Sequence, residues 1–170
     1  NLNINKLTVV SFDLEKEGLI ALQENLALFP YVKEFSELLP LCISQNKILY
    51  QLPDGRLFEW IFVQGNFCET IAFPAGTYPL ANVVCYDFFS PASHPHLWTL
   101  QVFLNLKAHL AVDSKIITYS SATCARAVMF ASGLFVGFGP ISGKKSKSTI
   151  ATTIFFELQE PLSLDWRNTF

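Results

Sequence analysis

Short apolar runs rich in β-branched and aromatic residues recur along this chain and alternate with amphipathic segments. Such runs predict strands buried in a sheet, whereas leucines three or four residues apart predict helices with one apolar face. Leu19, Leu22 and Leu26 have that helical spacing. The expected strands are residues 7–12, 47–52, 57–64, 82–86, 115–119, 134–138 and 148–156.

Proline and glycine set the expected limits of the first elements. The helix after Asp13 should end near Pro30, and a short helix over residues 31–39 should end before Pro40, because proline interrupts a helix. Residues 53–56, Pro-Asp-Gly-Arg, favour a tight turn between two strands. A hairpin is therefore expected there.

Two further helices are expected in the second half, over residues 96–110 and 123–132. Residues 113–114, Asp-Ser, are predicted to be a tight link before the next strand. Ser121 can cap the last helix through its hydroxyl, and Gly133 suits the left-handed position that follows a helix.

Strands that alternate with helices and close in an antiparallel pair are typical of an α/β protein with a mostly parallel sheet. Residues 134–138 and 148–156 should pair antiparallel near the C-terminal end, since their connection is too short for a crossover helix. Residues 7–12, 82–86 and 115–119 should lie parallel in one sheet, with Asp13, Asp87 and residues 119–121 at the same edge.

Composition predicts a single domain over residues 1–170, since 51% of the residues are hydrophobic and 16 of them are Phe. No apolar run approaches the roughly 20 residues that span a bilayer, and the first residues lack the pattern of a signal peptide. We therefore expect a cytoplasmic protein with no membrane partner.

The cysteines indicate no metal site. Cys42, Cys68, Cys85 and Cys124 are scattered and form no C-x-x-C pair, which favours free thiols over disulfides or zinc ligands.

Net charge is −2, which does not indicate a nucleic-acid-binding protein. Lys144, Lys145 and Lys147 nevertheless lie within four residues of one another. This cluster is either a solvated loop or a contact for the phosphates of a polyanionic substrate.

One acidic residue stands where an expected strand ends. Asp87 directly follows residues 82–86 and begins the sequence Asp-Phe-Phe-Ser-Pro, which ends at Pro91. Ligands of open α/β sheets bind outside the carboxyl ends of the strands, so Asp87 is a candidate for reaction chemistry. The alternative is that Asp87 caps the helix expected near His96.

Several local sequences carry a family resemblance. They are Val-Ser-Phe-Asp at 10–13, Gly-Asn-Phe at 65–67, the block from Tyr86 to Thr99, Thr-Tyr-Ser-Ser-Ala at 118–122 with Arg126, and the glycine- and lysine-containing stretch 133–145. Together they resemble the methyltransferase domain that makes 5-methylaminomethyl-2-thiouridine at the wobble position of tRNA, as in the bifunctional MnmC enzymes and their stand-alone relatives. The likeness extends over nearly the whole chain.

The resemblance implies a Rossmann-like fold and an S-adenosylmethionine-dependent N-methyltransferase acting on the aminomethyl group of a modified wobble uridine. Its substrate would be tRNA, and an FAD-dependent oxidase domain would be a fusion or association partner. Asp13 would bind the ribose hydroxyls of S-adenosylmethionine, and Asn66, where the family has Asp, would lie beside the adenine. Asp87 would be catalytic. The implied substrate-binding residues are Phe89, Pro91, Trp98, Lys144 and Lys145.

Each of these roles has a structural alternative. Asp13 could cap the following helix, Asn66 could belong to a plain Gly-Asn turn, and Phe89 and Trp98 could be core residues. The family's Gly-rich cofactor loop has no counterpart here, so we expect a domain that is incomplete at its amino terminus and binds S-adenosylmethionine weakly by itself.

A non-catalytic or decayed methyltransferase-like module, with a binding or structural role, is the alternative function. A dehydrogenase is disfavoured because no G-x-G-x-x-G follows a strand, and a serine hydrolase because no G-x-S-x-G is present.

Overall fold

The computed structural model describes residues 4–142 and 146–163 of the 170-residue chain. Strands and helices alternate through these residues, so the α/β class is confirmed. The chain divides into two compact units, Asn1–Thr70 and Ile71–Phe170, each with a sheet of its own.

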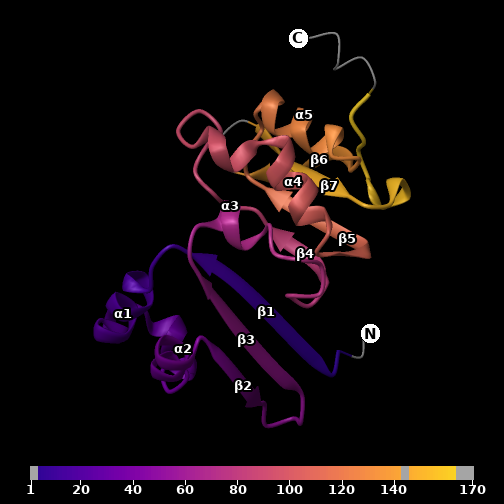
Figure 1. Cartoon of the computed structure of the whole chain (residues 1–170). Coiled ribbons are helices and arrows are strands. Elements are labelled where there is room, and N and C mark those ends of the chain that lie inside the picture. Colours follow the sequence, from indigo (N-terminus) through magenta and orange to yellow (C-terminus); the bar gives the residue numbers. More distant parts are fainter. Residues whose placement is uncertain (1–3, 143–145, 164–170) are drawn as a thin grey trace. The chain divides into compact units, whose positions relative to one another are not determined.

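The first unit holds a three-stranded sheet with the order β1-β3-β2, drawn in indigo and purple in Figure 1. Its elements are β1 (Lys6–Asp13), α1 (Glu17–Glu24), the 3₁₀ helices η1 (Leu26–Leu28) and η2 (Pro30–Phe35), α2 (Leu39–Gln45), β2 (Lys47–Gln51), β3 (Leu57–Gln64) and α3 (Phe67–Thr70). β1 pairs parallel with β3, and β2 pairs antiparallel with β3. The expected hairpin is confirmed, and Gly55 supplies its left-handed residue with φ 86°.

Pro40 begins a helix here, so the prediction that a helix ends before it is wrong. Pro30–Phe35 forms only a 3₁₀ helix, and α2 starts at Leu39 with Pro40 in its first turn. The first turn of a helix leaves its N–H groups unbonded, so a residue without an N–H costs nothing there. Asn46, at φ 59°, then ends α2 in the left-handed conformation.

One face of this sheet is covered by the helices. Cys42 of α2 packs with Leu38, Ile48 and Phe62 in a buried cluster, against which Leu19 of α1 is half-buried. Burial raises the pKa of the Cys42 thiol, so Cys42 behaves as a small apolar core residue.

The same sheet carries a charged cluster around Glu59. This buried carboxylate of β3 accepts hydrogen bonds or ion pairs from Lys6 at 2.7 Å, Lys47 at 2.9 Å and the Thr8 hydroxyl at 3.1 Å. The hydrogen bonds from Lys6 and then Lys47 lower the pKa of Glu59 from 4.5 to about 2. Glu59 thereby links β1, β3 and β2 across the sheet.

Glu59→Gln should destabilise this unit by roughly 1–2 kcal/mol at neutral pH, since charge-assisted hydrogen bonds are lost. A carboxyl group whose pKa is lowered by folding stabilises the folded state at pH values above its ordinary pKa. For Glu59 this contribution disappears as the pH falls from about 4.5 towards 2. Urea unfolding at pH 7 and pH 3 should therefore show that the free energy of unfolding falls less on acidification in the variant than in the wild type. Asp54→Asn, which breaks the exposed pair with Arg56, is the control and should change stability little.

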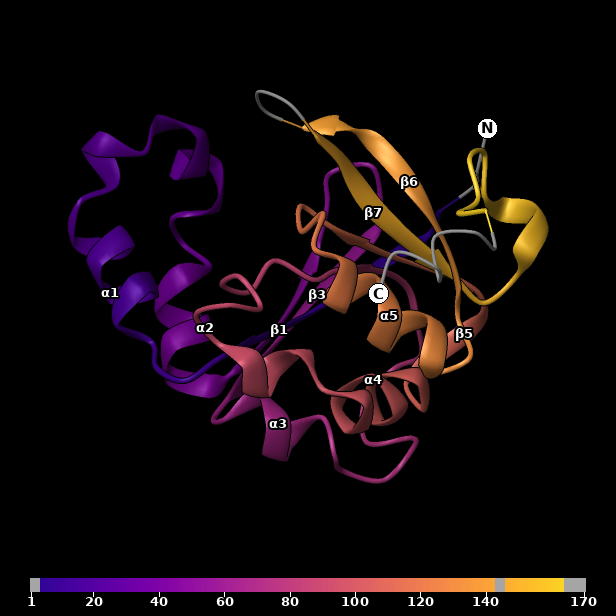
Figure 2. The same ribbon diagram turned by 90° about the horizontal axis from the view of Figure 1, so that it is seen from above.

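The second unit holds a four-stranded sheet with the order β4-β5-β7-β6. Its elements are β4 (Ala81–Cys85), η3 (Pro95–Trp98), α4 (Leu100–Lys107), β5 (Leu110–Thr118), α5 (Thr123–Ala131), β6 (Phe135–Ser142), β7 (Ser146–Thr152) and η4 (Phe155–Glu157). β4 and β5 are parallel, and the expected antiparallel pair β6–β7 is confirmed. Figure 2 shows β6 and β7 side by side as a long twisted ribbon.

One face of this sheet is core. Ile116, Thr149, Ala151 and Val136 are buried neighbours on β5, β7 and β6, and α5 packs on β6 and β7. Ala125 and Met129, four residues apart on α5, are buried on one face of this helix, as is typical of a helix on a sheet.

The strands lie in two sheets, whereas a single sheet was expected. β1 and β4 are edge strands of different sheets, so the parallel neighbours are β3 for β1 and β5 for β4. Because Asp13 and Asp87 belong to different units, their position at a common edge stays a prediction.

Three local expectations in the second unit need correction. Residues 113–114 are no link but part of β5. The residue that precedes α5 is Ala122, so Ser121 makes no side-chain cap. Residues 153–156 lie beyond β7, which ends at Thr152. The left-handed Gly133, at φ 81°, is confirmed.

Candidate functional site

The first half of the predicted site lies at the carboxyl ends of β1 and β3. Asp13 pairs with Gln64 in the last step of the parallel ladder, and the Gly65 N–H donates to the Asp13 carbonyl at 2.8 Å. Gly65 has φ 138°, which favours glycine at this turn. The parallel ladder therefore brings Asp13 next to the Gly65–Asn66 turn.

Asp13 is exposed, and it does not cap α1. The residue that precedes α1 is Lys16, and no side chain caps that helix. Within the described residues, the Asp13 carboxylate takes part in no hydrogen bond or ion pair. A carboxylate at a strand end with both oxygens available can accept two hydroxyl protons of a ribose, so this residue fits the cofactor that the sequence implies.

Asn66 is partly engaged by its own helix. Its Oδ1 accepts from the Cys68 N–H at 3.0 Å, and its Nδ2 donates to Glu69 at 3.2 Å. These bonds begin α3 in the manner of an N-cap. An amide oxygen has two lone pairs, so one acceptor site remains for a ligand.

The second half of the predicted site lies at the carboxyl end of β4. Asp87 follows that strand by two residues and is exposed. It caps neither following helix: η3 has no side-chain cap, and the Thr99 hydroxyl caps α4 by accepting from the Val102 N–H at 3.3 Å. In the part of the chain that the structure describes, no residue bonds to the Asp87 carboxylate.

Two buried aromatic residues hold the loop that carries Asp87. Tyr86 is 1% exposed and donates its hydroxyl to the Leu97 carbonyl. Trp98 is 6% exposed, lies edge-on to Tyr86 with ring centroids 5.0 Å apart, and donates from Nε1 to the Phe89 carbonyl at 2.9 Å. Trp98 is therefore a core residue that anchors the loop, and its buried ring offers no face for stacking on a base.

Phe89 is presented outward by the same loop. Its ring is 70% exposed and stacks on His94, with centroids 4.6 Å apart and planes at 23°. Pro91 follows Ser90 at the second position of a turn that is closed by the Ser93 N–H and the Ser90 carbonyl at 3.0 Å. Pro91 thus shapes the loop, and Phe89 remains available to a planar ligand.

Sequence reasoning missed one residue at this edge. His94 supports the Phe89 ring, and no sequence motif indicates that contact. Tyr119, which the sequence places at this edge, is 68% exposed, and it follows the paired position Ile117 by two residues, as Asp87 follows Cys85. The parallel pairing of β4 and β5 therefore brings Tyr119 and Asp87 to the same end of these two strands, as expected.

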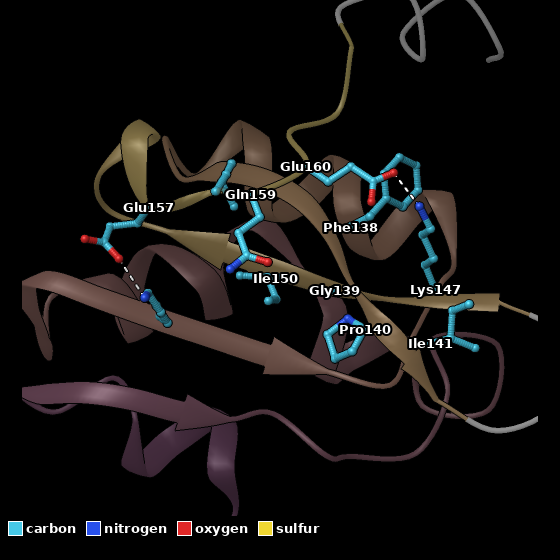
Figure 3. Close-up of a pocket in the computed structure, with 11 residues that line it drawn as sticks. Phe138, Gly139, Pro140, Ile141, Lys147, Ile150, Glu157, Gln159 and Glu160 are labelled. Atoms are coloured by element: carbon cyan, nitrogen blue, oxygen red, sulfur yellow. Dashed lines mark hydrogen bonds and ion pairs between the residues drawn. The ribbon is translucent and has the colours of Figure 1, made fainter.

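Lys144 and Lys145 lie outside the described residues. Lys147, from the same cluster, lies on β7, where it forms an ion pair with Glu160 and lies 5.5 Å from the centroid of the Phe138 ring. Figure 3 shows Lys147 and Phe138 at one end of a cavity.

This cavity has a volume of about 450 Å³ and lies between β6, β7 and the segment that follows η4. A Lys115–Glu157 ion pair of 2.6 Å borders it, and Lys147–Glu160 is a second ion pair in its wall. Both lysines are already paired, and none of the predicted site residues lines it. The cavity therefore does not replace the strand ends as the candidate site.

No group of three or more His, Cys, Asp or Glu able to hold a metal ion occurs among the described residues. The described cysteines form no disulfide; Cys42 is buried, whereas Cys85 and Cys124 are exposed. None of the described helices has the length and apolarity that a membrane-spanning helix requires.

Comparison with known proteins shows the family of this chain. The profile of the S-adenosyl-L-methionine-dependent methyltransferase family matches residues 67–154. The chain belongs to this family. The matched methyltransferase region contains Asp87, Phe89 and Trp98, whereas Asp13 and Asn66 precede it.

Individual relatives include MnmC. The tRNA 5-methylaminomethyl-2-thiouridine biosynthesis bifunctional protein MnmC of Pseudomonas fluorescens (strain Pf0-1) is 30% identical over 127 residues, which are 73% of this chain and 19% of that protein. An uncharacterized membrane protein, ycf78 of Stigeoclonium helveticum, is 26% identical over 121 residues, 71% of this chain and 3% of that protein. The chain thus spans a fifth or less of these relatives.

The crystal structure of MnmC2 from Aquifex aeolicus has a similar fold. The two superpose with a TM-score of 0.63 at 18% sequence identity, over 97% of this chain and 58% of that one. This methyltransferase is therefore MnmC-like in fold, as the sequence blocks predicted.

Proposed function

We propose that this chain is the methyl-transferring part of a tRNA-modifying enzyme that methylates the aminomethyl group of a modified wobble uridine. The observation that carries the proposal is the position of Asp87: exposed at the carboxyl end of β4, bonded to no other described residue, and held on a loop anchored by Tyr86 and Trp98. Catalytic and binding residues often lie on loops that a rigid scaffold positions, which supports a chemical role for Asp87.

Methylation of an amine requires its neutral form, with the nitrogen lone pair directed at the methyl carbon. S-adenosylmethionine supplies that carbon in an activated form. The Asp87 carboxylate would accept a hydrogen bond from the amine, orient it and take its proton. Phe89, with its exposed ring, and Tyr119 would stack on or flank the uridine base.

Asp13 and Asn66 would hold the cofactor's nucleoside. Asp13 would accept from the ribose hydroxyls, and the free acceptor site of the Asn66 amide would contact the adenine amino group. Lys144 and Lys145 would contact tRNA phosphates. The proposed partners are tRNA and an FAD-dependent oxidase domain in fusion or association; the likeness to MnmC, a bifunctional protein of tRNA modification, supports them.

Methylation of tRNA that carries the aminomethyl uridine, measured with the full-length protein and labelled S-adenosylmethionine, tests the function. Transfer of label to that uridine alone is the expected result. The competing function is a methyltransferase-like binding module, favoured by the use of the Asn66 amide in starting α3. Binding of tRNA without transfer, at saturating S-adenosylmethionine, would support that module instead.

Asp13→Ala should weaken binding of S-adenosylmethionine by about 10- to 100-fold, because hydrogen bonds to a charged acceptor are lost. Calorimetric titration of the full-length protein measures the change in Kd. Glu15→Ala is the matched control, since Glu15 is an exposed acid two residues further on, beyond the end of β1. Equal Kd values for the two variants would remove Asp13 from the cofactor site.

A further inference from the structure

Arg126 of α5 makes contacts that the proposed chemistry does not use. Its Nε donates to the Thr149 hydroxyl at 3.0 Å, and its Nη2 donates to the Lys147 carbonyl at 3.3 Å. The guanidinium lies 4.8 Å from the centroid of the Phe138 ring. Among the described residues no carboxylate pairs with Arg126, and burial lowers its pKa. The N–H groups of the Arg126 guanidinium therefore donate to a hydroxyl and a carbonyl oxygen rather than to a carboxylate.

The contact with Thr149 continues to the edge of the sheet. Thr149 is fully buried, and its hydroxyl donates to the Ser120 carbonyl at 2.6 Å. Ser120 lies in the loop between β5 and α5, where its N–H donates to the Thr118 hydroxyl at 3.2 Å. That loop follows the carboxyl end of β5, beside the segment that carries Asp87, since the Tyr86 N–H donates to the Ile117 carbonyl at 2.8 Å.

Through the Lys147 carbonyl, Arg126 also contacts the hairpin of β6 and β7, here called the lysine hairpin. Lys147 is close to the start of β7, and its backbone lies next to residues 144–145 in the sequence. One side chain thus bonds to groups in two separate features of the second unit: the strand that holds the loop at the strand ends, and the start of β7 in the hairpin. A planar guanidinium fixes two such partners in a set geometry, which a lysine ammonium does not.

We propose that Arg126 is a positioning residue for methyl transfer, which holds the β5–α5 loop through Thr149 and the start of β7 in the lysine hairpin through the Lys147 carbonyl. This inference rests on the proposed function. Arg126 acts through other residues, and it touches neither substrate nor cofactor in this account. Loss of either link leaves a buried hydroxyl or carbonyl without its partner, so the corresponding feature should shift.

The two links can be broken separately. Thr149→Val keeps the side-chain volume and the Arg126–Lys147 contact but removes the hydroxyl that reaches Ser120. It should lower kcat for tRNA methylation by about 10- to 100-fold and leave the KM for tRNA unchanged, as expected when the loop beside the reacting Asp87 shifts and misplaces it. Arg126→Met removes both links and should lower kcat similarly while raising the KM for tRNA severalfold.

Conservative variants separate positioning from general damage. Thr149→Ser retains the hydroxyl and should behave as the wild type. Ser148→Ala removes a different hydrogen bond of the same hairpin, from the Ser148 hydroxyl to the Pro140 carbonyl at 2.8 Å, and should leave kcat and KM near wild-type values. A Thr149→Val enzyme as active as Thr149→Ser would overturn the inference.

Amide hydrogen exchange gives a readout that does not need activity. The N–H groups of Ser120 and Ala122, which donate to the Thr118 and Ser120 hydroxyls, should exchange faster in Thr149→Val and Arg126→Met but not in Ser148→Ala. Unchanged exchange in both variants would contradict the proposal. An inactive wild type would refute the proposed function and this inference together, whereas an active wild type with unaffected variants would refute the inference alone.

Discussion

Asp87→Asn should reduce the rate of methyl transfer by about 10²–10⁴-fold, the range typical of a lost general base. Asparagine has nearly the same shape as aspartate but cannot take the proton of the amine. Since the Asp87 carboxylate bonds to no other described residue and caps neither η3 nor α4, the fold should be unaffected. Single-turnover methylation of tRNA with the aminomethyl uridine, at saturating S-adenosylmethionine, isolates this step.

The matched control is Asp113→Asn, which changes an exposed aspartate of β5 whose Oδ1 accepts from Asn82 at 3.3 Å. Both variants should retain the thermal unfolding midpoint of the wild type, and Asp113→Asn should also retain its rate. An Asp87→Asn rate within a few-fold of the wild type would refute the catalytic role. A second outcome is informative as well: equal slowing by both variants would indicate a general loss of negative charge.

The sequence predicted the strands of this protein well because their pattern is local. β1, β4 and β5 are short β-branched runs that are recognisable without knowing their neighbours. Which strand pairs with which is a long-range property: Lys6 of β1 pairs with Leu57, 51 positions away in the chain. This is why the division of the strands between two sheets was not predicted.

Capping was the least predictable feature at the candidate site. Asp13, Asp87 and Ser121 were each plausible caps by composition, yet none of them caps a helix, whereas Thr99 does. A cap depends on where the first helical turn begins, to within one residue. The apolar run 82–86 located Asp87 correctly at a strand end, but the sequence could not separate the exposed Phe89 from the buried Trp98.

Trp98→Ala should cost about 3–5 kcal/mol of stability, the range for truncating a buried aromatic side chain to alanine. The ring packs against Tyr86 and Phe103, at centroid distances of 5.0 and 6.2 Å. Its Nε1–H also bonds to the Phe89 carbonyl at 2.9 Å. Urea unfolding of the full-length protein measures the change.

Two further variants separate the role of Trp98 in stability from a role in substrate binding. They are Trp98→Phe and Phe89→Ala. Trp98→Phe keeps most of the packing and loses the hydrogen bond, so it should cost only about 1–2 kcal/mol. Phe89→Ala removes a ring that is 70% exposed, so stability should change by less than about 0.5 kcal/mol, while the KM for tRNA should rise. If Trp98 instead stacked on the base, Trp98→Ala would raise the KM for tRNA with little loss of stability. That result would contradict its assignment as the anchor of the loop that carries Asp87.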